Sequence, residues 1–159
     1  MHAKALGSQG LRVSPLGLGC MGLTFGYGPV DRARAVATVE RALELGVTFF
    51  DTSDHFRRVS PRFKGENLHR NRQLVEPILT IARERGATPA QVALAWILAS
   101  VPEAVPIPGT TRPGRVEENV GSLDVTLTDS DKRTLDQSFP AGAAAGTRWP
   151  SAMMALLEG

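Results

Sequence analysis

The residues best suited to chemistry lie where a short β-branched run ends and a helix is expected to begin. They combine a glycine turn, two hydroxyl groups and two arginines with an acid and an amide one helical turn further on. These residues are Gly109, Thr110, Thr111, Arg112, Arg115, Glu118 and Asn119. Free N–H groups and the positive end of a helix attract an anion, and arginines add charge-assisted hydrogen bonds to a phosphate.

This pattern predicts a site for the adenosine end of a phosphorylated dinucleotide. We expect Thr110, Thr111 and Arg115 to contact the phosphates, while Glu118 and Asn119 offer hydrogen bonds suited to a purine edge. The alternative for the same residues is an ordinary strand-to-helix turn with a solvated face.

A second glycine pattern, at residues 17–22, fits G-x-G-x-x-G but is not interpreted as a dinucleotide fingerprint. That fingerprint must open a helix at once. Here two more glycines and Pro29 follow, and a helical pattern is expected to start only at Asp31.

Composition and charge exclude several function classes. The single cysteine, Cys20, allows no internal disulfide and suits a reducing, cytoplasmic compartment. A net charge of +2 is too small to indicate nucleic acid or a membrane surface, and no apolar run approaches the ~20 residues of a membrane span. Arginines gather between residues 57 and 72, where we expect a solvated loop. No metal ligands are assigned.

Six stretches of the chain resemble aldo-keto reductases, in the order in which that family has them. They are residues 6–11, 16–22, 46–52 (GVTFFDT), 60–63 (SPRF), 89–96 (PAQVALAW) and 107–119. The resemblance implies an α/β fold of the (β/α)8 TIM-barrel type and NADPH-dependent reduction of small aldehydes and ketones.

The chain is too short for a complete barrel of this type, because such a barrel takes about 250 residues and this chain has 159. The stretches before Asp51 resemble the start of the family sequence, and those after Phe56 resemble its last third. We therefore expect one truncated domain over residues 1–159, with an N-terminal part (1–53), a C-terminal part (54–159) and a large internal deletion. It would be a partial barrel that retains strands 1, 2 and 8 with their helices.

The deletion bears on catalysis. The family reduces carbonyls with an Asp, a Tyr, a Lys and a His. Asp51 matches the Asp, Phe56 stands where the Tyr is expected, and the strands that carry the Lys and the His are missing. The chain is thus expected to be catalytically impaired and to bind NADP(H) weakly. Gly19, Cys20, Met21 and Asp51 would lie on the nicotinamide side.

Two alternatives remain beside an impaired reductase. One is a non-catalytic fragment that binds a nucleotide or another subunit, and the other is a non-functional gene remnant. An open barrel would bare the inner face of its sheet, including Phe49 and parts of Leu16 and Leu18. We therefore expect self-association through that face.

Local signals predict the remaining elements. A hairpin is expected at residues 4–7 and 11–13, and strands at 15–18, 47–50 and 104–108. Helices are expected from the Asp31 cap to Gly46, with Val36, Val39 and Leu43 as its apolar positions, and from about Glu76. A capping box at Thr88 should begin a buried helix, and Thr128 should cap a last one.

Overall fold

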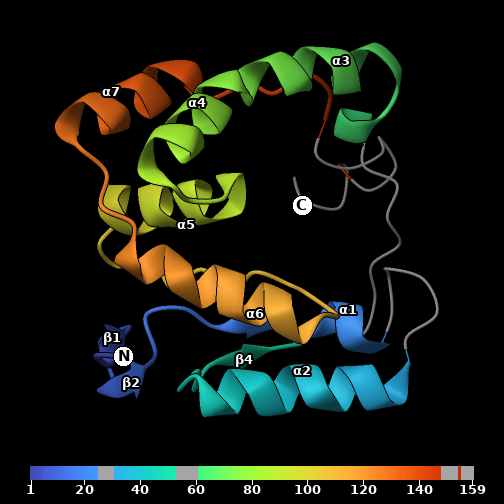
Figure 1. Cartoon of the computed structure of the whole chain (residues 1–159), viewed down its shortest axis with the longest axis vertical. Helices are drawn as coiled ribbons and strands as arrows, with labels where there is room; N and C mark the ends of the chain where they lie inside the picture. The colour runs from blue at the N-terminus through green and yellow to red at the C-terminus, as the bar shows by residue number, and fades with distance from the viewer. Residues whose placement is uncertain (25–30, 53–60, 148–153, 155–159) are drawn as a thin grey trace.

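A computed structural model describes residues 1–24, 31–52, 61–147 and 154 of the chain, and Figure 1 shows their arrangement. The elements are β1 (Lys4–Leu6), β2 (Leu11–Val13), β3 (Leu18–Gly19), α1 (Met21–Thr24), α2 (Arg32–Glu44), β4 (Phe50–Asp51), η1 (Pro61–Phe63), α3 (Gly65–Leu74), α4 (Glu76–Arg85), α5 (Pro89–Ser100), α6 (Pro113–Val120), η2 (Gly121–Asp124) and α7 (Asp129–Ser138). None of the helices in these ranges is long and apolar enough to cross a membrane.

Three segments lie side by side in the predicted order, with β3 in the middle. β3 pairs in parallel with β4, with Leu18 opposite Phe50. On its other side, the N–H groups of Gly17 and Gly19 donate to the carbonyls of Pro106 (2.8 Å) and Pro108 (3.2 Å). No closed barrel forms among the described residues. The described residues nevertheless form helices around a small sheet with a parallel pair, so the predicted α/β class is confirmed.

The strand expected at residues 104–108 does not form as a regular element. Only an isolated parallel bridge, between Gly19 and Gly109, is found there. Pro106 and Pro108 lack the N–H groups that a continuous ladder needs, which explains the difference. The other two barrel strands are shorter than expected and shifted toward their carboxyl ends, at Leu18–Gly19 and Phe50–Asp51. The N-terminal hairpin of β1 and β2 is confirmed as an antiparallel pair.

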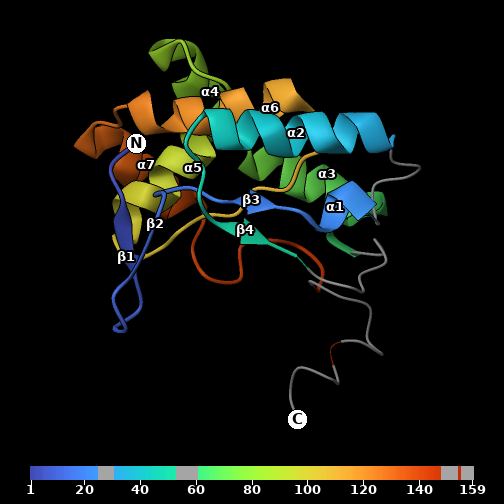
Figure 2. The same ribbon diagram turned by 90° about the horizontal axis from the view of Figure 1, so that it is seen from below.

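Helices α2 and α6 cover one face of this small sheet, as Figure 2 shows from below. The core between them holds Leu18, Leu23, Ala42, Val47 and Val116. The carboxylate of Asp31 accepts a hydrogen bond from the Ala33 N–H at 3.0 Å, so the predicted cap is confirmed.

The predicted apolar stripe of α2 is wrong in part. Val36 and Leu43 are 49% and 58% exposed, whereas Thr38 and Ala42 are fully buried. The small residues lie on the face that meets α6, because close helix packing favours them there. Val36 and Leu43 lie on an exposed flank of α2.

The expected exposure of the inner sheet face is also wrong for two residues. Leu16 and Leu18 are only 1% and 2% exposed. Gly17 faces the other way, since a Cβ there would lie 2.8 Å from the Phe49 carbonyl oxygen and 3.0 Å from Ile107 Cγ2. On the inner face of the sheet, Phe49 and Ile107 therefore lie on either side of Gly17.

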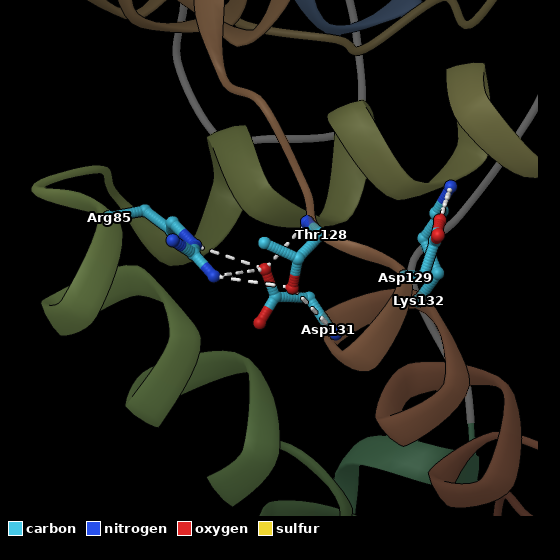
Figure 3. Close-up of polar contacts among 5 residues, drawn as sticks. All are labelled: Arg85, Thr128, Asp129, Asp131 and Lys132. Atoms are coloured by element: carbon cyan, nitrogen blue, oxygen red, sulfur yellow. Dashed lines mark hydrogen bonds and ion pairs between the residues drawn. The ribbon is translucent and has the colours of Figure 1, made fainter.

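A second core joins α4, α5 and α7. It is made of Ile78, Ile81, Ala82, Val92 and Leu135. Capping boxes at Thr88 and Thr128 are both present, so these two predicted helix starts are confirmed. In the second box, Arg85 of α4 reaches the carboxylate of Asp131 at 2.6 Å and ties α4 to the start of α7 (Figure 3).

Two helices were not predicted. α1 begins two residues after Gly19, although no helix was expected before Asp31. It has only four residues, too few to supply the long helix of a dinucleotide fold. α3 is strongly polar and buries none of its residues, so it carries no apolar periodicity from which it could be recognised.

Candidate nucleotide-binding site

One pocket of about 370 Å³ gathers most of the residues predicted to hold the adenosine end of a nucleotide. Its walls are formed by Ala90, Pro108, Gly109, Thr110, Thr111, Arg112, Arg115 and Asn119. Only Glu118, among the predicted adenosine-side residues, is not part of the wall. Two arginines, two hydroxyls and an amide around one hollow are groups suited to a phosphate and a base.

The pocket lies where the chain leaves the sheet and enters α6. The bridge to Gly19 fixes Gly109, and the hydroxyl oxygen of Thr110 accepts a hydrogen bond from the Arg112 N–H at 3.1 Å. α6 then begins with Pro113, and a Cβ placed on Gly114 would meet no atom within 4 Å. The N-terminus of α6 is thus open to an approaching anion.

A second helix start adjoins the first. Ala90 is the second residue of α5, behind the Thr88 capping box, and its presence in the wall brings the α5 N-terminus to the pocket. The Thr88 hydroxyl is bonded to the Gln91 N–H, and Pro89 has no N–H. No hydrogen bond of the Ala90 N–H to another described residue is found. The start of α5 therefore borders the same hollow as the start of α6.

Arg115 and Glu118 form an ion pair within α6. The Arg115 side chain is 55% exposed and that of Glu118 only 14%. Burial acts to raise the pKa of the Glu118 carboxyl, but hydrogen bonds with Thr88 and Arg115 outweigh it and hold that pKa below its usual range. Glu118 is therefore ionised at neutral pH and holds Arg115 at the mouth of the pocket.

Asn119 is the buried member of the set, with 8% exposure. Its side chain belongs to the pocket wall. A buried amide normally has partners. Asn119 can therefore give hydrogen bonds to a ligand.

The residues predicted for the nicotinamide side also come together, at the ends of β3 and β4. Gly19 is opposite Asp51 in the register, and the Cys20 N–H donates to the Asp51 carbonyl at 2.7 Å. Burial, followed by the charge of Asp51, raises the pKa of the Cys20 thiol. Met21 begins α1 directly behind them. Gly19 bridges to Gly109, so the predicted nicotinamide-side residues and the predicted adenosine-side residues meet at the carboxyl-terminal ends of the strands.

Phe56, which stands where the family Tyr is expected, lies outside the described residues. Ala90 was missed, although the Thr88-Pro89-Ala90-Gln91 capping box marked a helix start with a free N–H near its second position. That motif could have identified it.

The comparisons with known proteins show the family of the chain. The model of the aldo/keto reductase family matches residues 15–70 and 56–139. These two matches cover most of the chain and include both halves of the candidate site. The chain belongs to the aldo/keto reductase family.

Three relatives show how much of the family is present. A probable aldo-keto reductase of Glycine max is 42% identical over 92 residues, which are 58% of this chain and 27% of that protein. An NADP(+) aldo-keto reductase of Schizosaccharomyces pombe is 40% identical over 95 residues, 60% of this chain and 28% of the relative. An aldo-keto reductase of Strobilurus tenacellus is 36% identical over 116 residues, 60% of this chain and 34% of the relative. The matches thus span about a third of these relatives or less.

Proposed function

We propose that this chain binds the adenosine end of NADP(H) and does not itself reduce carbonyl compounds. The observation that carries the proposal is the pocket at the start of α6, whose wall holds Arg112, Arg115, two threonines and Asn119. Support for the phosphorylated cofactor comes from the relative in Schizosaccharomyces pombe, whose name includes NADP(+).

The donor set suits the 2′-phosphate and the base. Thr110, Thr111 and Arg115 would hold the phosphates, because hydroxyls and a guanidinium give short hydrogen bonds to a dianion. Glu118 and Asn119 would contact the adenine edge. Glu118 already forms an ion pair with Arg115, so a bound phosphate would have to replace Glu118 as the partner of the Arg115 guanidinium. Binding would therefore be weaker than the count of donors suggests.

On the nicotinamide side the proposed contacts are Gly19, Cys20, Met21 and Asp51. NADPH supplies a hydride when bound, but carbonyl reduction also needs a proton donor. Asp51 is the one member of the family's catalytic set that this sequence retains. It is exposed, and Phe56 replaces the proton-donating Tyr. Loss of a positioned general acid alone lowers a rate by about 10²–10⁴-fold.

We further propose that residues 1–159 form one truncated domain, an arc that retains strands 1, 2 and 8 of the family barrel. The order of segment 105–109, β3 and β4 supports this, because the first and eighth strands are neighbours in a barrel of eight. Residues 1–53 and 54–159 would be the two parts joined by the deletion. A cytoplasmic location is proposed from the single cysteine, Cys20.

The binding proposal can be tested with halves of the cofactor. Isothermal titration should show 2′,5′-ADP binding and no measurable binding of 5′-AMP, because the 2′-phosphate supplies the contact to Arg115. Equal binding of the two nucleotides would contradict the proposal.

The absence of reductase activity has its own test. In a mixture of the protein, NADPH and a simple aldehyde, the absorbance of the reduced nicotinamide should fall no faster than in the same mixture without the protein. Turnover that survives repurification from a host without endogenous reductases would overturn this part of the proposal.

A further inference from the structure

Glu118 differs from its neighbours on α6 in its relation to the pocket. Arg115 and Asn119 both belong to the pocket wall, whereas Glu118, which lies between them in the sequence, does not. The Arg115 guanidinium is bonded to the Glu118 carboxylate and is the more exposed partner, because the Arg115 side chain is 55% exposed and that of Glu118 is 14% exposed. The carboxylate is thus paired with the guanidinium and is not presented to the pocket.

The carboxylate is the fixed member of this pair, and the guanidinium is the movable one. A second hydrogen bond, with the side chain of Thr88 at the start of α5, holds Glu118 from the neighbouring helix. The same Thr88 hydroxyl accepts from the Gln91 N–H at 3.2 Å, so the capping box fixes its position. Because the Arg115 side chain is more than half exposed, its guanidinium can turn while Glu118 stays bonded to Thr88.

Both charged groups of the pair have a use at the adenosine end of the cofactor. A guanidinium forms charge-assisted hydrogen bonds with a phosphate, and a carboxylate accepts strong hydrogen bonds from N–H donors. The exocyclic amino group of adenine is such a donor. Burial acts to raise the pKa of Glu118, but its hydrogen bonds with Thr88 and Arg115 outweigh that effect and lower the pKa. The ionised carboxylate is therefore an acceptor only.

We propose that this chain recognises the 2′-phosphate and the adenine base together, through an exchange of partners at Arg115. The inference rests on the proposed binding of NADP(H). The 2′-phosphate takes the Arg115 guanidinium, and the Glu118 carboxylate, still held by Thr88, is released to accept from the adenine amino group. Without a 2′-phosphate, Arg115 stays on Glu118 and the amino group meets no free carboxylate. The identity of the base therefore matters for NADPH and matters little for NADH.

Four nucleotides test the coupling: NADPH, NADH and the analogue of each in which hypoxanthine replaces adenine. Hypoxanthine carries a carbonyl oxygen in place of the amino group, so it has no donor for Glu118 at that position. In fluorescence titrations of the wild-type chain, the replacement should weaken NADPH binding about tenfold, the effect of one hydrogen bond to a charged group, and should change NADH binding less than about twofold.

Two variants of α6 separate the exchange from independent contacts. Arg115→Ala leaves the Glu118 carboxylate free for both cofactors, so the base replacement should now weaken NADPH and NADH equally, by about tenfold. Glu118→Gln removes the charged acceptor, so the replacement should cost less than about threefold for both cofactors. Glu117→Gln removes the same charge from the next residue, which is 51% exposed and bonded to Arg41, and as the matched control it should behave like the wild type. Far-UV circular dichroism checks that each variant is folded.

The outcomes separate this proposal from the one on which it rests. A base effect that is confined to NADPH in the wild-type chain and extends to NADH in Arg115→Ala would support the exchange. A preference for NADPH over NADH, with the same cost of the base replacement in both cofactors, would overturn the exchange and leave the proposed cofactor binding intact. Equal affinity for NADPH and NADH, or no binding of either, would overturn both proposals.

Discussion

Replacing Asp131 by asparagine should destabilise the chain by about 1–3 kcal/mol. The carboxylate is 6% exposed, accepts from the Thr128 N–H at 2.8 Å and binds Arg85 at 2.6 Å. Hydrogen bonds to charged groups contribute about 1.5–3 kcal/mol each, and asparagine keeps only the neutral part of the capping box. The partly exposed Arg85 can turn toward water, which limits the loss. Urea unfolding followed by circular dichroism measures it.

The effect should depend on pH in a defined direction. Burial acts to raise the pKa of Asp131, but hydrogen bonds from Thr128 and Arg85 outweigh it and lower that pKa. A lowered folded-state pKa adds stability that is present above the unfolded value of about 3.9 and is lost as pH falls through the folded value. The difference between wild type and Asp131→Asn should therefore be constant above about pH 5 and shrink below about pH 4.

Asp129 provides the control, since it lies in the same first turn of α7 (Figure 3). Its side chain is 81% exposed, and its ion pair with Lys132 at 2.6 Å faces solvent. Asp129→Asn should leave the urea midpoint unchanged, because exposed ion pairs contribute little. Equal shifts for the two variants, or no shift for Asp131→Asn, would refute the reasoning about burial.

Three further variants test other contacts. Ser122→Ala should stabilise the chain by about 1 kcal/mol, because the buried Ser122 hydroxyl has no hydrogen-bond partner among the described residues; a lower urea midpoint would argue against this. Asn71→Ala should speed proteolysis within residues 141–147, since the Asn71 side chain holds Ala145 at 2.7 Å and 3.0 Å; an unchanged cleavage rate would show that other contacts hold this segment. Gly17→Ala should destabilise the chain by about 1–3 kcal/mol, because a Cβ would lie 2.8 Å from the Phe49 carbonyl oxygen, and unchanged thermal unfolding would contradict the close approach.

Local chemistry made several elements predictable from the sequence. The caps at Asp31, Thr88 and Thr128 each depend on side chains within three residues of a helix start, so the residues themselves specify them. The phosphate-type residues 109–119 could be grouped for the same reason, because one turn and one helix carry them. The order of the three sheet segments followed from the family resemblance.

The remaining features depend on neighbours that a sequence pattern does not contain. Whether Val36 or Thr38 lies in the core is decided by the helix that packs on α2, and α6 meets the small residues. Segment 105–109 reads as a strand by its β-branched residues, yet its prolines prevent a ladder. Ala90 joins the site from a helix about 20 residues earlier in the chain, a proximity that only the fold provides.

Preference for NADPH over NADH tests the central claim most directly, namely that the adenosine-side pocket holds the cofactor. In fluorescence titrations the wild-type chain should bind NADPH more tightly than NADH, because a guanidinium contact to the 2′-phosphate has no counterpart in NADH. Arg115→Ala should remove that preference while circular dichroism stays unchanged. Equal affinity of the wild-type chain for the two cofactors, or a preference that survives Arg115→Ala, would contradict the account.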